Sequence, residues 1–291
     1  MPMQVLVTGA AGQLGSEVCK ALLEAGHAVR ATDAVFRKGL PALLDVADLL
    51  DYRAAYRLME GCDAVAHLAN HANMGVRRPG QLLYSENVTM DVNIFQAAAD
   101  LGVKRILFAS SVQALGGSRT GDNPPETPSC LKYLPIDGDA PACPGSLYAL
   151  SKEAGEQQLK FYAARDPELS ATAVRFPALW GLRHVEWIRR ARGERPDRPH
   201  GFLDEGFAYL HISDGASLVA AVIEKQAPGY HQLFPAAPAP YLSMPIPDIV
   251  RQFYAGVPLR VPIEEMKCLV DCSAIEKTLG WKPKNAGLFA E

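Results

Sequence analysis

Apolar residues in the first 180 positions fall into two alternating patterns. Short β-rich runs, which predict buried strands, cover residues 4–7, 27–33, 64–69, 105–109 and 171–175. The stretches between them that carry apolar residues at helical spacing cover residues 16–25, 52–60, 88–101 and 145–165. Strand–helix–strand units of this kind build parallel sheets. The pattern therefore predicts an α/β fold with a doubly wound parallel sheet, the Rossmann fold, over residues 1–180.

The alternation ends after Gly181. Residues 183–198 are strongly basic and helical in part, later residues carry many prolines, and a further helix is predicted over 214–225. We expect residues 181–291 to form a small substrate-binding lid region interleaved with the main domain. Residues 116–144 are rich in Gly, Pro, Asp and Thr, which predicts a long connection lying over the site.

The composition narrows the class of protein. With 291 residues, 48% of them apolar, the chain can bury a large core. A net charge of −3 and a pI of about 6.2 disfavour binding to nucleic acid or to an anionic membrane. No apolar run approaches the ~18 residues of a membrane span, and the N-terminus carries no signal-peptide pattern. The six cysteines lack CxxC spacing and a histidine cluster, so we expect reduced cytoplasmic thiols and no metal site.

Three glycines follow the first predicted strand, Gly9, Gly12 and Gly15, in GxxGxxG spacing. Gly9 permits a tight turn, Gly12 lets the backbone approach a pyrophosphate, and Gly15 lets the following helix pack closely on the strand. Gln13 and Leu14 open that helix, whose N-terminal N–H groups favour phosphate. The glycines alone also fit an ordinary turn, but the strand before them and the helix after them favour a dinucleotide site.

Asp33 ends the second predicted strand, 33 − 15 = 18 residues past Gly15. A carboxylate at this place accepts hydrogen bonds from the adenosine ribose and repels a 2′-phosphate, which favours NAD over NADP as the cofactor. Arg37 and Lys38 lie close by and are long enough to reach such a phosphate, so the sequence leaves the NADP alternative open.

Tyr148 and Lys152 lie four residues apart and therefore on one face of a predicted helix. A phenol, with an ordinary pKa of about 10, is a poor base at neutral pH, but a neighbouring ammonium lowers that pKa. Such a tyrosine exchanges a proton with a carbinol while hydride leaves or enters the same carbon. Ser111 ends an apolar strand, at the sheet edge where such folds bind ligands. Each residue alone fits an ordinary packed side chain, but together they predict hydride transfer.

Further segments resemble those of one known family. Leu68-Ala69-Asn70 resembles its segment beneath the cofactor, and Phe108-Ala109-Ser110-Ser111 with Gly116 resembles its Ser-Ser strand end. Residues 144–156 are similar to its Pro-x-x-x-Tyr-x-x-Ser-Lys-x-x-x-Glu helix, and Leu279-Gly280-Trp281-Lys282-Pro283 matches a further signature. Over almost its full length the chain resembles an extended short-chain dehydrogenase/reductase of the NAD-dependent epimerase/dehydratase family.

The match continues in two other segments. Asp45-Val46 resembles the family's Asp-Leu or Asp-Val pair, which meets the adenine. Asn87-Val88 resembles the start of its Asn-Val-x-Gly-Thr helix, in which Met90-Asp91 here replaces the Gly-Thr.

The resemblance implies roles for individual residues. Ser111, Tyr148 and Lys152 would form a catalytic triad. The implied NAD-binding residues are Gly9, Gly12, Gln13, Leu14, Gly15, Asp33, Asp45, Val46, Leu68, Ala69, Asn70, Ser110, Tyr148, Lys152, Phe176 and Pro177. The implied substrate-binding residues are Asn70, His71, Ser111, Gln113, Tyr148 and Ala178. Because the helices near 88–101 and 148–165 often pair subunits in this family, a homodimer is expected.

Departures from the family bear on the reaction. Dehydratases and decarboxylases carry an acid where Gln113 stands, and a neutral amide disfavours elimination and decarboxylation. Nucleotide-sugar epimerases often place Asn where Ala178 stands and Arg where Phe207 stands, so two expected diphosphate contacts are missing.

We therefore predict an NAD-dependent oxidoreductase that acts on a hydroxyl or ketone of a sugar or sugar-derived small molecule. Net oxidation or reduction of a free sugar or sugar acid, in the manner of uronate dehydrogenases, is one form of this chemistry. A nucleotide-sugar epimerase that works through a transient 4-keto intermediate is the first alternative. The second alternative is a regulatory protein that senses a dinucleotide without turnover.

Overall fold

Seven parallel strands form the main sheet, in the order β3-β2-β1-β4-β5-β6-β9. The computed structural model describes residues 1–72, 78–116, 119, 128–181 and 203–285. The strands are β1 Gln4–Thr8, β2 Ala28–Asp33, β3 Leu44–Val46, β4 Ala64–His67, β5 Arg105–Ser111, β6 Ser170–Phe176 and β9 Gly229–Leu233. The strand order reverses between β1 and β4, which is where doubly wound sheets bind their ligands.

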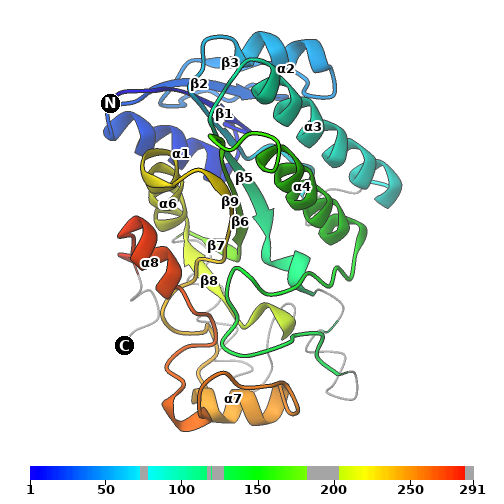
Figure 1. Ribbon diagram of the computed structural model, residues 1–291, viewed down its shortest axis with the longest axis vertical. Coiled ribbons are helices and arrows are strands. Elements are labelled where there is room, and N and C mark those ends of the chain that lie inside the picture. Colours follow the sequence, from blue (N-terminus) through cyan, green and yellow to red (C-terminus); the bar gives the residue numbers. More distant parts are fainter. Residues whose placement is uncertain (73–77, 117–118, 120–127, 182–202, 286–291) are drawn as a thin grey trace.

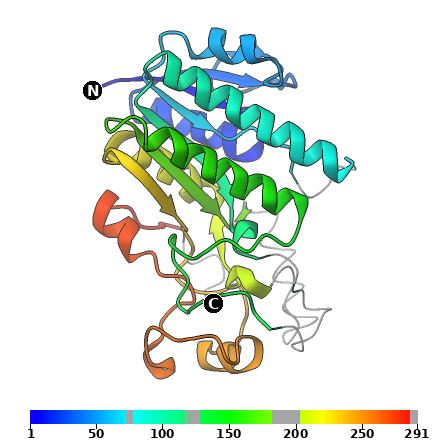
Figure 2. The ribbon, with the colours of Figure 1, turned by 45° about the vertical axis from the view of Figure 1, so that its right-hand side comes forward.

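Helices cover both faces of this sheet (Figure 1). Successive side chains of β1 point to opposite faces, so Val5 and Val7 belong to one hydrophobic core and Leu6 to another. The helices on the face of Val5 are α1 Gln13–Glu24, α6 Ile212–Lys225 and α8 Ser273–Leu279. The helices on the face of Leu6 are α2 Tyr52–Met59, α3 Gly80–Asp100 and α4 Leu147–Ala163. Figure 2 shows α3 and α4 running side by side across that face.

A third hydrophobic core lies beyond the carboxyl ends of the strands, in the lower part of Figure 1, and we call this part the second lobe. It draws Leu134 and Ile136 from before residue 181 and Tyr241 and Tyr254 from after it. Its elements are short: β7 Ala178–Trp180, the parallel β8 Tyr209–His211, α7 Ile246–Phe253, and the 3₁₀ turns η1 Val112–Leu115, η2 Leu203–Glu205 and η3 Ile263–Glu265.

The predicted doubly wound sheet is confirmed. The apolar pattern did not reveal β3 and β9, the two edge strands, and β9 extends the sheet past residue 180. The helix predicted over 88–101 begins earlier, at Gly80. The basic stretch 183–198 and parts of the connection 116–144 lie outside the described residues. Within the described residues, no helix combines the length and the apolar character that a membrane span requires.

Candidate active site

A cavity of about 850 Å³ opens at the carboxyl ends of the central strands. It lies at the reversal of the strand order, where the predicted dinucleotide site was expected. The residues predicted from the sequence that line it are Gly9, Gly12, Gln13, Leu14, Gly15, Asp33, Leu68, Ala69, Asn70, His71, Ser110, Ser111, Tyr148, Phe176 and Pro177. The fold thus brings together side chains that are far apart in the sequence.

The glycine turn between β1 and α1 leaves no room for side chains. Gly9 has φ +67°, and a Cβ added there would lie 2.8 Å from the Ala69 nitrogen. A Cβ on Gly15 would lie only 2.1 Å from the Gly9 carbonyl oxygen. Gly12 is the N-cap of α1, and no described side chain caps this end of the helix. The first turn of α1 therefore presents N–H groups and a positive helix end to the cavity, a suitable cradle for a pyrophosphate.

Asp33 lies at the end of β2 and holds the glycine turn in place. Its Oδ2 accepts a hydrogen bond from the Ala11 N–H at 2.9 Å, and its Oδ1 accepts one from the Val35 N–H at 3.2 Å. The Arg37 guanidinium donates to the Ala11 carbonyl oxygen at 2.8 Å. Arg37 thus has a partner within the turn, while the Asp33 carboxylate lines the cavity.

Asp45 and Val46 do not line the cavity, in contrast to the expectation from the sequence. The Asp45 carboxylate contacts the Arg57 guanidinium at 2.5 Å, and half of Val46 is exposed elsewhere on the surface. Because β3 ends at Val46, the chain enters the cavity only afterwards, and Asp48 and Leu49 line it instead. The second pair repeats the Asp-Val/Leu pattern three residues later, a signal that was present in the sequence.

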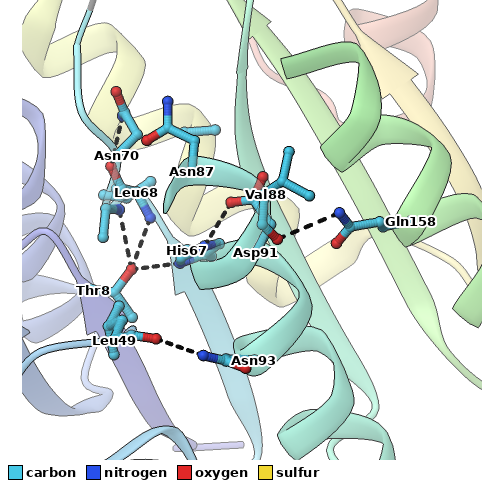
Figure 3. Close-up of polar contacts among 12 residues, drawn as sticks. Thr8, Leu49, His67, Leu68, Asn70, Asn87, Val88, Asp91, Asn93 and Gln158 are labelled. Carbon is cyan, nitrogen blue, oxygen red and sulfur yellow. Dashed lines mark hydrogen bonds and ion pairs between the residues drawn. The ribbon is translucent and has the colours of Figure 1, made fainter. Parts of the chain in front are cut away.

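Asn93 of α3 fixes this segment of the cavity wall (Figure 3). Its side-chain amide donates to the Leu49 carbonyl oxygen at 2.8 Å and to the Leu50 carbonyl oxygen at 3.3 Å. Both leucines line the cavity, so Asn93 acts on the site without touching it.

Ser111, Tyr148 and Lys152 converge near the floor of the cavity. Ser111 ends β5, and its hydroxyl accepts the Gln113 N–H at 3.2 Å and lies within hydrogen-bonding reach of the Tyr148 phenol. Tyr148 lies in the first turn of α4, whose N-cap is Ser146. The Lys152 ammonium donates to the Ala109 carbonyl oxygen at 2.8 Å and lies 5.8 Å from the centre of the Tyr148 ring.

Burial shifts the pKa values of Tyr148 and Lys152 in the directions that favour the neutral side chains. Burial raises the pKa of Tyr148 to about 12; the Ser111 contact lowers it, and the charges of Glu205 and Asp91 raise it further. Burial lowers the pKa of Lys152 to about 8, while the charges of Asp91 and Glu156 raise it. In the protein without cofactor, the pKa of Tyr148 is therefore raised, and the lowering expected from the sequence stays a prediction for the complex with NAD. The Tyr148 phenol therefore stays protonated at neutral pH, whereas the Lys152 ammonium loses its proton close to neutral pH.

Ser110 lines the cavity but has its hydroxyl engaged. It donates to Oε1 of Glu156 at 2.6 Å, and Arg175 holds both oxygens of Glu156 at 2.8 Å. All three residues are buried. This ion pair ties the ends of β5 and β6 to α4, so its main effect is to position the strand end that carries Ser111.

His71 lines the cavity within a polar cluster. Its Nε2 lies 2.9 Å from a Glu86 carboxylate oxygen that also contacts Arg78, and Arg78 lines the cavity as well. Burial lowers the pKa of His71. The Asn87 side chain accepts the His71 N–H at 2.7 Å and donates to its carbonyl oxygen at 3.2 Å, which fixes the backbone.

The remaining predicted residues lie beside the cavity rather than on its wall. Gln113 is in η1 directly after Ser111, Ala178 is in β7 opposite Tyr209, and Lys152 lies beneath the surface, 1% exposed. Glu205 was not identified from the sequence, although its charge raises the pKa of Tyr148. Among the residues the structure describes, no group of three or more His, Cys, Asp or Glu could hold a metal ion.

Comparisons with known proteins agree with this geometry. Residues 5–233 match the model of the NAD dependent epimerase/dehydratase family, so the chain belongs to that family. Its enzymes depend on NAD, and NAD is the cofactor expected from Asp33.

Relatives within the family act on different substrates. A uronate dehydrogenase of Pseudomonas syringae pv. tomato is 34% identical over 167 residues, 56% of this chain and 54% of that protein. The chain thus spans about half the length of this relative. A UDP-glucose 4-epimerase of Corynebacterium glutamicum is 26% identical over 98% of this chain and 92% of its own. The structure of MoeE5 in complex with UDP-glucuronic acid and NAD shares the fold, with a TM-score of 0.68, 23% identity and coverage of 98% and 96%.

Proposed function

We propose that this protein oxidises a hydroxyl, or reduces the corresponding ketone, of a sugar or sugar-derived small molecule with NAD. The observation that carries the proposal is the convergence of Ser111, Tyr148 and Lys152 on a cavity that begins at the glycine turn. A proton-transferring phenol next to a dinucleotide cradle is the arrangement that hydride transfer at a carbinol carbon requires.

The residues of the cavity fit NAD along its length. The pyrophosphate would lie on Gly12, Gln13 and Leu14, because the N-terminal end of α1 presents to the cavity there N–H groups that no described side chain caps. The adenosine ribose would meet Asp33. Asp48 and Leu49, rather than Asp45 and Val46, would meet the adenine, since they line the wall.

The nicotinamide end would meet residues at the other side of the cavity. The wall there consists of Leu68, Ala69, Asn70, Ser110, Phe176 and Pro177. Lys152 lies below, and the ammonium has donors beyond the one given to Ala109, which can bind ribose hydroxyls.

Each catalytic side chain has one task. Bound NAD supplies the acceptor for the hydride that leaves the carbinol carbon. Ser111 binds the reacting oxygen and orients it toward Tyr148. Tyr148 accepts the hydroxyl proton during oxidation and returns it during reduction. Lys152 stabilises the phenolate, and the Ala109 carbonyl oxygen holds the ammonium in place.

The second lobe favours a substrate without a nucleotide. Phe207, which stands where epimerases often carry arginine, is fully buried against Tyr241, Phe253 and Tyr254. Ala178 offers no polar side-chain atom. These two positions therefore supply no charge or amide for a diphosphate, which favours a free sugar or sugar acid. We place Asn70, His71, Gln113 and Ala178 around that substrate.

Epimerisation of a nucleotide sugar is the second candidate, because the Corynebacterium glutamicum epimerase aligns with nearly the whole chain. One assay separates the two reactions. The protein is mixed with NAD and a panel of free sugars, sugar acids and nucleotide sugars, and NADH absorbance and proton NMR are recorded. Net NADH with a free sugar or sugar acid supports the dehydrogenase, whereas a new epimer without net NADH supports the epimerase. Binding of NAD without turnover on any substrate favours the dinucleotide sensor.

We also propose a homodimer in the cytoplasm. Apolar side chains are exposed on α3 and α4, among them Leu82, Val92, Leu150 and Phe161. A paired helix surface would cover them. All six cysteines are free thiols, which fits a reducing compartment. Sedimentation measurements that give the mass of a single chain at micromolar concentration contradict the dimer.

A further inference from the structure

Asp91 stands where the family's helix pattern has threonine, and the reaction above gives its carboxyl no role. The residue lies in α3 and is 1% exposed. Its Oδ1 lies 3.0 Å from Nε2 of His67, a fully buried residue of β4. The pair of His67 and Asp91 thus lies in the protein interior, at the end of β4, from which the chain leads into the cavity wall at Leu68 and Ala69 (Figure 3).

His67 is in turn held by the residue before the glycine turn. Its Nδ1 lies 2.7 Å from the Thr8 hydroxyl oxygen, which also accepts the Leu68 and Ala69 N–H groups at 3.1 Å. Leu68 and Ala69 line the cavity. One connected set of contacts therefore runs from the end of β1, through β4, to the Asp91 carboxyl.

The second oxygen of Asp91 is buried and, among the described residues, has no hydrogen-bond partner. It lies against α4 at Gly155, where an added Cβ would be 2.7 Å from this oxygen and 2.5 Å from Cζ of Phe108. Gly155 follows Lys152 by three residues, so both lie on the same face of α4. The missing side chain at Gly155 lets a carboxylate approach the helix face that carries the lysine.

Lys152 needs a negative charge nearby because it is an ammonium taken out of water. It lies 4.9 Å from the centre of the Phe108 ring, and the His67 ring stacks on the same phenylalanine at 6.1 Å. Asp91 is the charge that raises the pKa of Lys152 most, ahead of Glu156. Glu156 is already paired with Arg175 in two hydrogen bonds, and so its charge is largely balanced.

We infer that Asp91 is a positioning residue for proton transfer: held by His67 and Thr8, its carboxylate stabilises the buried Lys152 ammonium that acts on Tyr148. The inference rests on the proposed function, since it takes Lys152 as part of the reaction. The titratable groups that face this site are His67 on β4 and Lys152, Glu156 and Tyr148 on α4. Without Asp91, Glu156, which Arg175 already balances, is the one carboxylate of the described residues that still raises the pKa of Lys152.

Two variants test the role. Asp91→Asn keeps the shape of the side chain, and Asp91→Thr introduces the family's residue and keeps a hydroxyl for His67. The titration of Lys152 is followed by NMR of labelled lysine side chains in the protein without NAD, with the signal assigned from Lys152→Arg. We expect the titration midpoint to move to lower pH in both variants. Turnover at pH 7 should fall about tenfold, with an altered pH profile. Asp100→Asn, which removes an exposed carboxylate from the same helix, should change neither.

The results test the role of Asp91 separately from the proposed sugar oxidation. An unchanged Lys152 titration in either folded variant overturns it. Failure of both variants to fold also overturns it, because Asp91 would then serve the structure only. The titration needs no substrate, so a shifted midpoint in a protein that turns over no sugar supports the role of Asp91 and counts only against the proposed function.

Discussion

The two ends of the cavity are built in different ways. The end where we propose NAD binds is one continuous turn between β1 and α1, and Asp33 at the end of β2 holds this turn through the Ala11 N–H. The end where we propose the substrate binds borders the second lobe. Its elements η1, β7, β8 and η2 come from distant parts of the chain, and Leu179 of β7 lines the cavity.

This difference explains why the glycine-turn end of the cavity can be predicted from a single sequence and the other end cannot. Every dinucleotide carries the same pyrophosphate group, and the backbone that approaches it closely demands glycine at particular positions. A substrate pocket depends on side chains whose identities can change while the second lobe keeps its core. The contrast therefore predicts two kinds of effect. Substitutions near the glycine turn should weaken NAD binding through steric clashes, whereas substitutions near the second lobe should act by changing the charge around Tyr148.

The largest expected effect is at Tyr148, where the two ends meet. Tyr148→Phe removes the phenol oxygen that we propose exchanges the proton but keeps the ring, so kcat should fall by about 10²–10⁴. The dissociation constant for NAD, measured by fluorescence quenching, should stay the same. Unchanged turnover in this variant would assign proton transfer to another group and remove the basis of the proposed function.

Gly15→Ala tests whether a steric clash in the glycine turn weakens NAD binding. Its Cβ would lie 2.1 Å from the Gly9 carbonyl oxygen, so the turn must open and NAD affinity should fall at least tenfold. Gly26→Ala, between α1 and β2, is the control: alanine at its φ of +86° strains the backbone, but an added Cβ has no neighbour within 4 Å, so this variant lacks the close approach found at Gly15. Isothermal titration calorimetry compares the two. Equal affinities in both variants would show that the close packing at Gly15 does not serve the cofactor.

A smaller effect, on the KM for NAD, should distinguish Asp45-Val46 from Asp48-Leu49, the two similar pairs that precede α2. Asp48 lies on the cavity wall, whereas the Asp45 carboxylate is bound to Arg57 outside it. Asp48→Ala should raise the KM for NAD by several-fold, roughly the value of one or two hydrogen bonds. Asp45→Ala should leave that KM unchanged. The reverse result would support the assignment of Asp45 expected from the sequence.

The sequence predicted the central strands, the glycine turn and the shared helix face of Tyr148 and Lys152, because each depends on local periodicity or on spacing within one helix. It offered two similar pairs three residues apart, and because β3 ends at Val46 the structure lines the cavity with Asp48 and Leu49 instead of Asp45 and Val46. It could not reveal Asp91 or Glu205 as neighbours of the triad. Their closeness to Lys152 and Tyr148 arises from packing between α3, α4 and η2, which no spacing in the chain encodes.

Glu205 offers the test with the smallest expected effect, because it is a buried carboxyl of the second lobe that raises the pKa of Tyr148 when it is ionised. Burial raises the pKa of its carboxyl to about 8, and its Oε1 has no hydrogen-bond partner among the described residues. In the unfolded chain the group ionises near 4.5. Between these values the folded protein binds more protons than the unfolded chain, so this group lowers the stability as pH rises from about 4.5 to about 8.

Glu205→Gln removes this titration and keeps the size of the side chain. The melting temperature of the variant relative to the wild type should be unchanged below pH 4 and should increase through the window, by roughly 2–4 °C for each kcal/mol recovered. Glu24→Gln, an exposed carboxyl on α1, should show no such trend. A difference in melting temperature that does not vary with pH would mean that Glu205 is ionised in the folded protein. The substrate end would then hold a buried negative charge that repels sugar acids, and neutral sugars would become the preferred substrates.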